Sequence, residues 1–352
     1  MDSPDNDILF ERRGAAGIVT LNRPKALNAV THEMVRALER QLDAWANDGA
    51  VTRVIIAAAG ERAFSAGGDI RALYELGRAG RQDEALTFWR DEYPLNTTIK
   101  RYPKPYVALI DGIVMGGGVG VSVNGSHRVA GDRFQFAMPE VGIGFFPDVG
   151  ATWFLPRMPG ELGTWCALTG DRLKTSDSVA SGIATHHVRS DRFGDLTDAL
   201  CGNVSVDAVL AAFAEPRGEG PVIARRAAIG RLFAGDTVEH ILQNLDAAAG
   251  GPEAEWAAST AAAMRLKSPT SLKLALAQVR KGRDWSFEEC MKAEMRIVSR
   301  IVHGHDFYEG VRAVIVDKDN APRWRPAVLA EVTDAEVERH FASLGDDELR
   351  LS

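Results

Sequence analysis

Short apolar runs and amphipathic stretches alternate along the first 160 residues. Strand-length apolar runs occupy 17–21, 51–59 and 105–110, and a glycine or a polar residue ends each of them. From residue 30 to residue 45, apolar side chains recur every three or four positions, which places them on one face of a helix. The order strand, helix, strand predicts an α/β fold. The strands are short and are joined by long connecting segments. This predicts a core in which the chain winds in successive turns, rather than one built of stacked layers.

The alternation of predicted strands and helices continues to about residue 160, and beyond it the predicted elements are helices. We expect a glycine loop at 63–68, helices at 70–76, at 83–100 with a break at Pro94, and from 119 to 123, and strands at 127–130 and 134–138. Beyond residue 160, helix-length segments replace the strands, at 162–168, 177–183, 206–213, 254–266, 271–279, 287–302 and 306–316. The stretch 216–220 has the composition of a linker. These patterns predict an α/β core over 1–205 and a mainly helical C-terminal region over 206–352.

Composition narrows the class of protein. The chain has 352 residues, 45% hydrophobic and 25% charged, as expected for a soluble globular protein with a substantial core. The net charge of −7 argues against nucleic acid as a main partner. Three cysteines without CxxC spacing predict neither disulfides nor a zinc site. We find no signal-peptide pattern, and Asp111 with five glycines interrupts the apolar run 106–123, so we expect no membrane span and a cytoplasmic location.

Two glycine loops are candidates for binding a ligand through the backbone. Gly68 closes the segment 65–68 just before a predicted helix, and Gly117 is the centre of three consecutive glycines between a predicted strand and a predicted helix. Such positions free backbone N–H groups and align them with the positive end of a helix dipole. One amide from each loop can form an oxyanion hole. A simple tight turn is the alternative role for the first loop.

Two carboxylates occur within largely apolar sequence. Glu140 and Asp148 are separated by a stretch rich in glycine, phenylalanine and proline. A carboxylate among apolar residues has a raised pKa and can serve as a general acid or base near neutral pH. Helix capping or a salt bridge is the alternative for each, and Asp148 stands just before a predicted helix at 151–155.

Other motifs of catalysis and metal binding are missing from the sequence. It contains no GxSxG, GxGxxG or GxxxxGK motif. The pair His186-His187 and the run 303–306, which holds two further histidines, lack the HExxH spacing of a zinc site, so we expect no metal.

Taken together, these segments resemble the crotonase (enoyl-CoA hydratase/isomerase) superfamily. The resemblance is carried by 21–28 (LNRPKALN), 64–70 (FSAGGDI), the glycines 116–118 and Pro139-Glu140. Within the superfamily, the chain looks most like the 3-hydroxyisobutyryl-CoA hydrolases, on 67–73 (GGDIRAL), 137–140 (AMPE), 144–150 (GFFPDVG), 287–290 (FEEC), 303–307 (HGHDF) and 309–313 (EGVRA).

The resemblance implies a crotonase-like spiral of ββα units with a helical C-terminal region, and it implies site residues. The amides of Gly68 and Gly117 would hold the thioester oxyanion, Glu140 aligns with a catalytic glutamate and Asp148 with an acid typical of the hydrolases. Glu92, which by itself has the pattern of a solvated helix surface, matches a glutamate that contacts the substrate. The coenzyme A part of the substrate would bind at Lys25, Ala26, Leu27, Gly68, Asp69 and Ile70.

One departure from the superfamily pattern separates its subgroups. Hydratases of the superfamily usually carry a second catalytic glutamate two residues after the glycine triplet, and that position is Gly120 here. Adding water across a double bond benefits from two acids. We therefore expect hydrolysis of a short branched 3-hydroxyacyl-CoA, best matched by 3-hydroxyisobutyryl-CoA of valine breakdown, with Glu140 as base or nucleophile. Enoyl-CoA hydration or isomerisation, and non-catalytic acyl-CoA binding, are the alternatives. We expect no cofactor besides the substrate's coenzyme A, and a homo-oligomer is possible.

Overall fold

Two units, each assembled from separate segments of the chain, make up the computed structural model, which describes residues 7–351. Unit 1 holds the described residues through Asp69, then Asp91–Ala137 and Arg172–Ile223. Unit 2 holds the rest, from Ile70 to Arg90, from 138 to 171 and from 224 onward. The predicted boundary after residue 205 does not coincide with these limits, because residues 206–223 group with the first unit.

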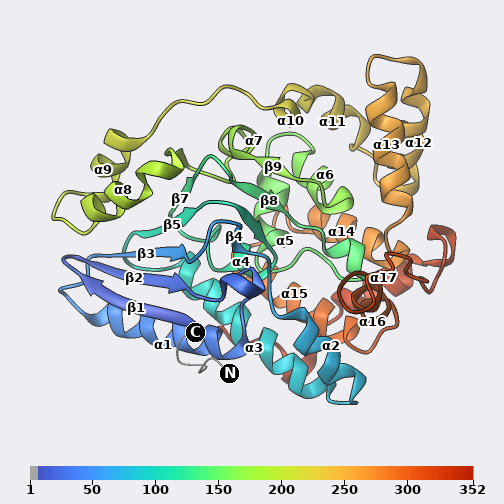
Figure 1. The fold of residues 1–352 in the computed structure, drawn as a ribbon. Helices are drawn as coiled ribbons and strands as arrows, with labels where there is room; N and C mark the ends of the chain where they lie inside the picture. The colour runs from blue at the N-terminus through green and yellow to red at the C-terminus, as the bar shows by residue number, and fades with distance from the viewer. Residues whose placement is uncertain (1–6, 352) are drawn as a thin grey trace. The chain divides into compact units, whose positions relative to one another are not determined.

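Unit 1 is built on two sheets (Figure 1). The strands of the larger sheet are, in spatial order, β1 (Ile8–Arg13), β2 (Ala16–Leu21), β3 (Arg53–Ala58), β5 (Tyr106–Ile110), β7 (His127–Ala130) and β10 (His186–His187). Those of the smaller sheet are β4 (Ala63–Ser65), β6 (Ile113–Met115), β8 (Gln135–Ala137) and β9 (Leu173–Lys174). All neighbours are parallel except β1 with β2 and β8 with β9.

Successive strand pairs alternate between the two sheets. In β3–β4, β5–β6 and β7–β8, the first strand joins the larger sheet and the second joins the smaller one. Helical segments follow the first two pairs and return the chain to the next strand of the larger sheet. Each repeat is therefore a ββα turn, which confirms the wound α/β core expected from the sequence.

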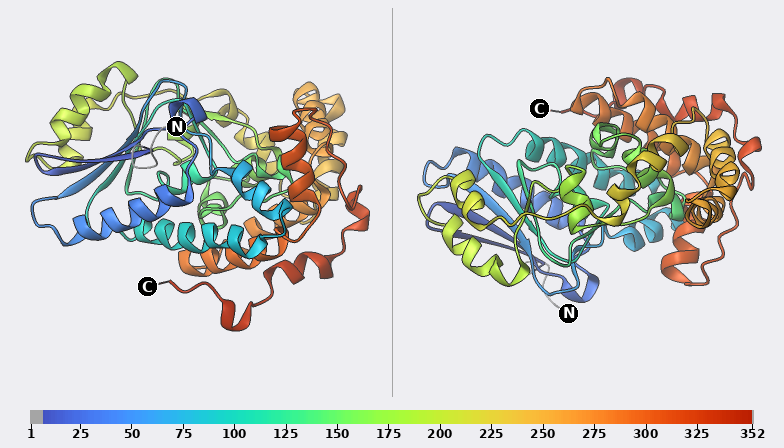
Figure 2. Two further views of the ribbon diagram at one scale, coloured as in Figure 1. Left: turned by 60° about the horizontal axis from the view of Figure 1, so that its bottom comes forward. Right: turned by 90° about the horizontal axis from the view of Figure 1, so that it is seen from above.

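Helices cover both faces of the larger sheet (Figure 2). On one face, α8 (Phe193–Leu200) and α9 (Val206–Phe213) bury leucines and valines against alternate strand residues such as Ile18 and Val107. On the other face lies α1 (His32–Asn47), whose Trp45 ring occupies the space that a side chain on Gly17 would need. Successive side chains of β2 thus point alternately toward the helices on one face of the sheet and toward α1 on the other.

The remaining helices of at least four residues belong mostly to unit 2. Unit 1 also contains α4 (Gly117–Gly120) and α7 (Thr175–Ala180), while α3 (Gln82–Lys100) and α10 (Pro221–Ala224) cross the division between the units. Unit 2 contains α2 (Ile70–Arg78), α5 (Ala151–Phe154), α6 (Leu162–Thr169), α11 (Arg226–Leu232), α12 (Val238–Ala247), α13 (Ala254–Arg265), α14 (Pro269–Lys281), α15 (Phe287–Ile301), α16 (Asp306–Val311) and α17 (Asp334–Phe341). A π-helical turn, Arg312–Val316, extends α16. The mainly helical C-terminal region is confirmed.

Some predicted elements differ from those observed. The break at Pro94 was wrong: α3 is continuous, because the fully buried Tyr93 and Leu95 anchor it on both sides of the proline and offset the lost backbone hydrogen bond. The segment 63–68, expected as a loop, begins with the three-residue strand β4. The helix expected from residue 119 begins two residues earlier, within the glycines.

Among residues 7–351, no helix is long and apolar enough to cross a membrane. The apolar run 106–123, which has the length of a membrane span, is divided between β5, β6 and α4.

The buried face of α1 yields a test of the fold. Leu42 lies on that face and is fully buried, so Leu42→Ala leaves a cavity under the sheet. We expect it to lower the free energy of unfolding by about 2–5 kcal/mol, measured by urea denaturation. Leu9→Ala on β1, where the leucine is 41% exposed, should cost less than about 1 kcal/mol. Equal losses for both would contradict the packing described.

Candidate active site

The two predicted oxyanion amides lie next to each other in unit 1. Gly117 is the first residue of α4, where N–H groups have no partner within the helix. A β-carbon placed on Gly117 would lie 3.1 Å from the backbone nitrogen of Gly68 and 2.8 Å from Oε1 of Glu92. Only a hydrogen atom fits at that point, so the identity of Gly117 follows from its surroundings.

The amide of Gly68 is held in place by its neighbours along the chain. Val30 pairs with the loop as an isolated bridge: its N–H donates to the Gly67 carbonyl at 2.8 Å, and its carbonyl accepts from Asp69 N–H at 2.9 Å. Gly67 has a φ of 120°, a conformation that side-chain-bearing residues rarely adopt. Two backbone hydrogen bonds thus fix the residues on either side of Gly68, and its role in binding an oxyanion stays a prediction.

The predicted coenzyme A segment is tied to the same loop. Lys25 and Ala26 are exposed in a short 3₁₀ turn, and the carbonyl of Leu27 accepts a hydrogen bond from the amide of Ala66 at 2.9 Å. The Arg23 guanidinium reaches Asp69 at 3.2 Å. Unit 1 thus brings together five of the six residues predicted for this role. The sixth, Ile70, begins α2 directly after Asp69.

Glu92 is a buried residue of α3 rather than a solvated one. Its side chain is 1% exposed, and its Oε1 lies beside the α-carbon of Gly117. The pattern along α3 does not predict this burial, because the helix carries polar residues on several faces. The solvated helix surface expected from the local pattern was therefore wrong, and the substrate contact implied by the resemblance stays a prediction.

Unit 2 contains the other two predicted acids, Glu140 and Asp148, both buried. Glu140 opens a short 3₁₀ turn that ends at Ile143, and its Oε2 has no hydrogen-bond partner within residues 7–351. Burial, and secondarily the negative charge of Asp148, raise the pKa of Glu140 well above its ordinary value of 4.5. The structure therefore provides a buried carboxyl group whose charged form is disfavoured and which has a second acid as its neighbour.

Asp148 lies on a strained turn, the Asp148 loop, which we define as residues 147–152. Val149 has a φ of 54° and Gly150 a φ of 97°. A positive φ is unusual for any β-branched residue and costs on the order of 1–3 kcal/mol. Such strain persists only where surrounding contacts impose it.

The capping role considered for Asp148 belongs to another residue. The N-cap of α5 is Gly150, and the N–H groups of Gly150 and Thr152 donate to the carboxylate of Glu294, at 2.9 and 3.0 Å. Glu294 was not among the predicted site residues. A signal did exist, because Glu294 falls on the apolar face of α15, four residues after Cys290 and three before Ile297.

Gly120 lies in α4 and is buried, so the chain places no carboxylate at this position. The departure noted in the sequence thus lies at a buried position of the folded unit.

The histidine clusters do not form a metal site. Nε2 of His187 lies 3.1 Å from Asp132, and Nε2 of His305 lies 2.9 Å from the carbonyl of Arg323. In the described part of the chain, no three histidine, cysteine or acidic residues are arranged to hold a metal ion.

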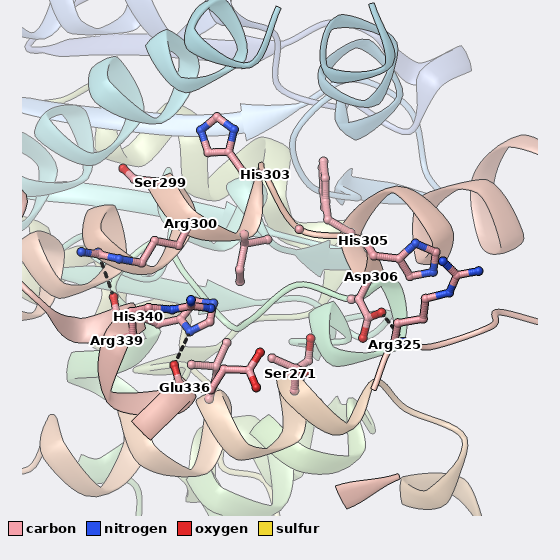
Figure 3. A pocket seen from close by; sticks show the side chains of 16 residues that line it. Ser271, Ser299, Arg300, His303, His305, Asp306, Arg325, Glu336, Arg339 and His340 are labelled. Carbon is pink, nitrogen blue, oxygen red and sulfur yellow. Dashed lines mark hydrogen bonds between the residues drawn. The ribbon is translucent and has the colours of Figure 1, made fainter. Parts of the chain in front are cut away.

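A pocket of about 470 Å³ in unit 2 contains none of the predicted site residues (Figure 3). His303, His305 and Asp306 contribute to its lining. Its Arg300 donates to the backbone carbonyl of His340, and Asp306 accepts from the backbone amide of Arg325 at 2.8 Å. These groups support the loops around the pocket instead of converging on its centre.

Comparison with known proteins settles the family. The family described as enoyl-CoA hydratase/isomerase matches residues 16–341. The chain belongs to this family. A relative from Danio rerio, named 3-hydroxyisobutyryl-CoA hydrolase, mitochondrial, is 48% identical over 98% of this chain and 92% of its own length. The protein of the same name from Homo sapiens is 42% identical, covering 98% and 91%.

Solved structures show the same fold. A structure described as a carnitinyl-CoA dehydratase from Mycobacterium thermoresistibile is 45% identical, with a TM-score of 0.92 and 98% coverage of both chains. One described as an enoyl-CoA hydratase from Rhodobacter sphaeroides is 39% identical, with a TM-score of 0.91, covering 98% of this chain and all of that one. The names of these family members differ in reaction, so the residues of the site must distinguish the alternatives.

The raised pKa of Glu140 makes the stability of the protein depend on pH. The folded state keeps a proton that the unfolded chain releases above about pH 4.5, so this stabilisation is complete below that pH and is lost as the pH rises toward the folded pKa. As the pH rises above about 4.5, we therefore expect the native protein to lose unfolding free energy more steeply than Glu140→Gln does. Urea denaturation at several pH values measures this difference.

Glu61→Gln is the control for this comparison, because that side chain is 85% exposed. Its stability should follow the native dependence on pH. A Glu140→Gln curve that also follows the native one would show that Glu140 titrates normally.

Proposed function

We propose that this chain hydrolyses 3-hydroxyisobutyryl-CoA to 3-hydroxyisobutyrate and coenzyme A. The observation that carries the proposal is the buried pair Glu140 and Asp148 in a chain that has glycine at position 120. A hydratase benefits from two glutamates to place water and move a proton across a double bond. The relatives named as hydrolases, matched over almost the whole chain, support the same choice.

The amides of Gly68 and Gly117 bind the thioester carbonyl oxygen. As the carbonyl carbon is attacked, that oxygen takes up negative charge, and fixed N–H donors stabilise it without rearranging. Each such donor contributes roughly 3–4 kcal/mol to the transition state. Both amides belong to turns whose backbone is already constrained, so little ordering is needed when substrate binds.

Glu140 starts the reaction and the neighbouring acids assist it. Either Glu140 takes a proton from water, which attacks the carbonyl carbon, or its carboxylate attacks to give an anhydride that water then hydrolyses. In both routes the carbon–sulfur bond breaks and the thiolate of coenzyme A receives a proton. Asp148 and Glu92 bind the 3-hydroxyl group or the water and help to deliver that proton.

The remaining assignments follow from the same reaction. Lys25, Ala26 and Leu27, with Gly68, Asp69 and Ile70, bind the coenzyme A part of the substrate, and no separate cofactor or metal takes part. The reaction belongs to valine breakdown. We place the protein in the cytoplasm, although the hydrolases it resembles are named as mitochondrial. Association into a homo-oligomer is part of the same proposal.

Thiol release from a panel of acyl-CoA esters tests the proposed reaction. We expect the highest kcat/KM with 3-hydroxyisobutyryl-CoA. Glu140→Gln and Asp148→Asn should each lose at least about 100-fold in kcat, because proton transfer fails, while both still bind the ester. Faster hydration of crotonyl-CoA than thiol release would favour the hydratase alternative. Binding of esters without any thiol release would favour a non-catalytic acyl-CoA-binding protein.

Gly117→Ala tests the oxyanion assignment separately. The added methyl group would come within 2.8 Å of Glu92 and 3.1 Å of the Gly68 nitrogen, which displaces the amides. We expect a loss of about 10²–10³-fold in kcat, measured by thiol release. Gly230→Ala in α11, where a β-carbon meets no atom within 4 Å, is the matched control and should keep native activity. A fully active Gly117→Ala would contradict the assignment.

A further inference from the structure

The Asp148 loop cannot hold its shape by local preference alone. Val149 is β-branched and has a φ of 54°, and Gly150 follows with a φ of 97°. A free peptide of this sequence would relax Val149 to a negative φ. Contacts from elsewhere in unit 2 must therefore maintain the turn that carries Asp148.

Two buried side chains from the C-terminal helices supply those contacts. Glu294 of α15 accepts the N–H groups of Gly150 and Thr152, one on each carboxylate oxygen. Gln278 of α14 donates to the carbonyl of Pro147 and, at 3.1 Å, to the hydroxyl of Thr152. Both side chains are completely buried, so water does not compete for these bonds. The loop is held on both sides of Asp148.

Glu294 also has an electrostatic relation to Asp148. Burial, followed by the negative charge of Asp148, raises the pKa of Glu294 to about 8, although the two amides and Thr152 oppose this shift. From α14 the loop receives the neutral Gln278, and on α15 itself the charge of Glu294 acts on the thiol of Cys290. Asp148 therefore acts on Glu140 and on Glu294, and the three acids are electrostatically coupled.

We infer that Glu294 is a positioning residue for the hydrolysis: its carboxyl group holds the strained Asp148 loop in the conformation that presents Asp148 next to Glu140. The inference rests on the proposed function for the role of Asp148. Glu294 holds the backbone and does not act on the substrate. Gln278 also holds the loop in place, but of these two side chains only that of Glu294 is titratable.

Glu294→Gln is the first test, read out by thiol release over a range of pH. The variant keeps the size of the side chain, but its amide NH₂ faces one backbone N–H and the loop loosens. We expect kcat to fall about 10- to 100-fold, with KM within about twofold of native. In the native enzyme, we expect kcat to decline near pH 8, because ionisation of Glu294 adds a negative charge beside Asp148. This alkaline decline should disappear in Glu294→Gln.

Gln278→Leu is the matched control. It removes contacts with the same loop but leaves Glu294 in place, so kcat should fall while the alkaline decline persists. Glu294→Asp restores a carboxylate, and we expect it to regain the alkaline decline and part of the lost kcat. Native kcat, or a retained alkaline decline, in Glu294→Gln would overturn the inference. If Glu294→Gln does not fold, an unchanged kcat in Glu294→Asp has the same meaning.

Amide hydrogen exchange separates this inference from the proposed function. The amides of Gly150 and Thr152 should exchange faster in Glu294→Gln than in the native protein, whatever the substrate is. A native protein that releases no thiol from any ester contradicts the hydrolysis alone. Unchanged exchange at both amides contradicts the role of Glu294 alone.

Discussion

Unit 2 keeps two like-charged side chains close together and away from water, and much of its construction follows from this constraint. Glu140 and Asp148 are both buried, and the charge of Asp148 adds to the cost of ionising Glu140. Carboxyl groups in such surroundings move apart or turn toward solvent unless the backbone prevents it. The turn that opens at Glu140 and the strained Asp148 loop provide that restraint.

The two units differ in the polar groups that they contain. Unit 1 supplies neutral N–H donors on turns where glycine is required by close approach, as at Gly117, or by a positive φ, as at Gly67. Unit 2 supplies acids whose proton affinity depends on burial. The donors need close placement of the backbone, and Gly68 and Gly117 follow the paired parallel strands β4 and β6. The acids need a low-polarity environment, which the helices provide through their apolar faces.

The sequence predicts the parts of the molecule whose signals are local. The strand at 17–21 appears as expected because it is a continuous apolar run, and the helix face from Met34 to Trp45 because its periodicity reflects burial on one side. The three-residue strands β4 and β6 are too short to show a period. Pro94 is a strong local signal that tertiary packing overrides.

The residues of the candidate site also differ in whether the local sequence reveals them. Gly68, Gly117, Glu140 and Asp148 stand out in the sequence because glycine runs and acids among apolar residues are unusual. The burial of Glu92 depends on what lies opposite α3, and the role of Glu294 depends on a loop that is 144 residues earlier in the chain. Neither the burial of Glu92 nor the contact between Glu294 and the loop can be recognised from the residues next to them in the sequence. Even so, an acid on the apolar face of α15 is a conflict that sequence inspection can find.

The long separation between Glu294 and the Asp148 loop has a consequence for the growing chain. Both sheets of unit 1 are complete once residue 187 has been made, and their strands can pair from then on. Gln278 and Glu294 leave the ribosome only after roughly another hundred residues. Until then, the side chains that hold the Asp148 loop are absent. A nascent chain can therefore pair its strands well before α14 and α15 are available to support the strained turn.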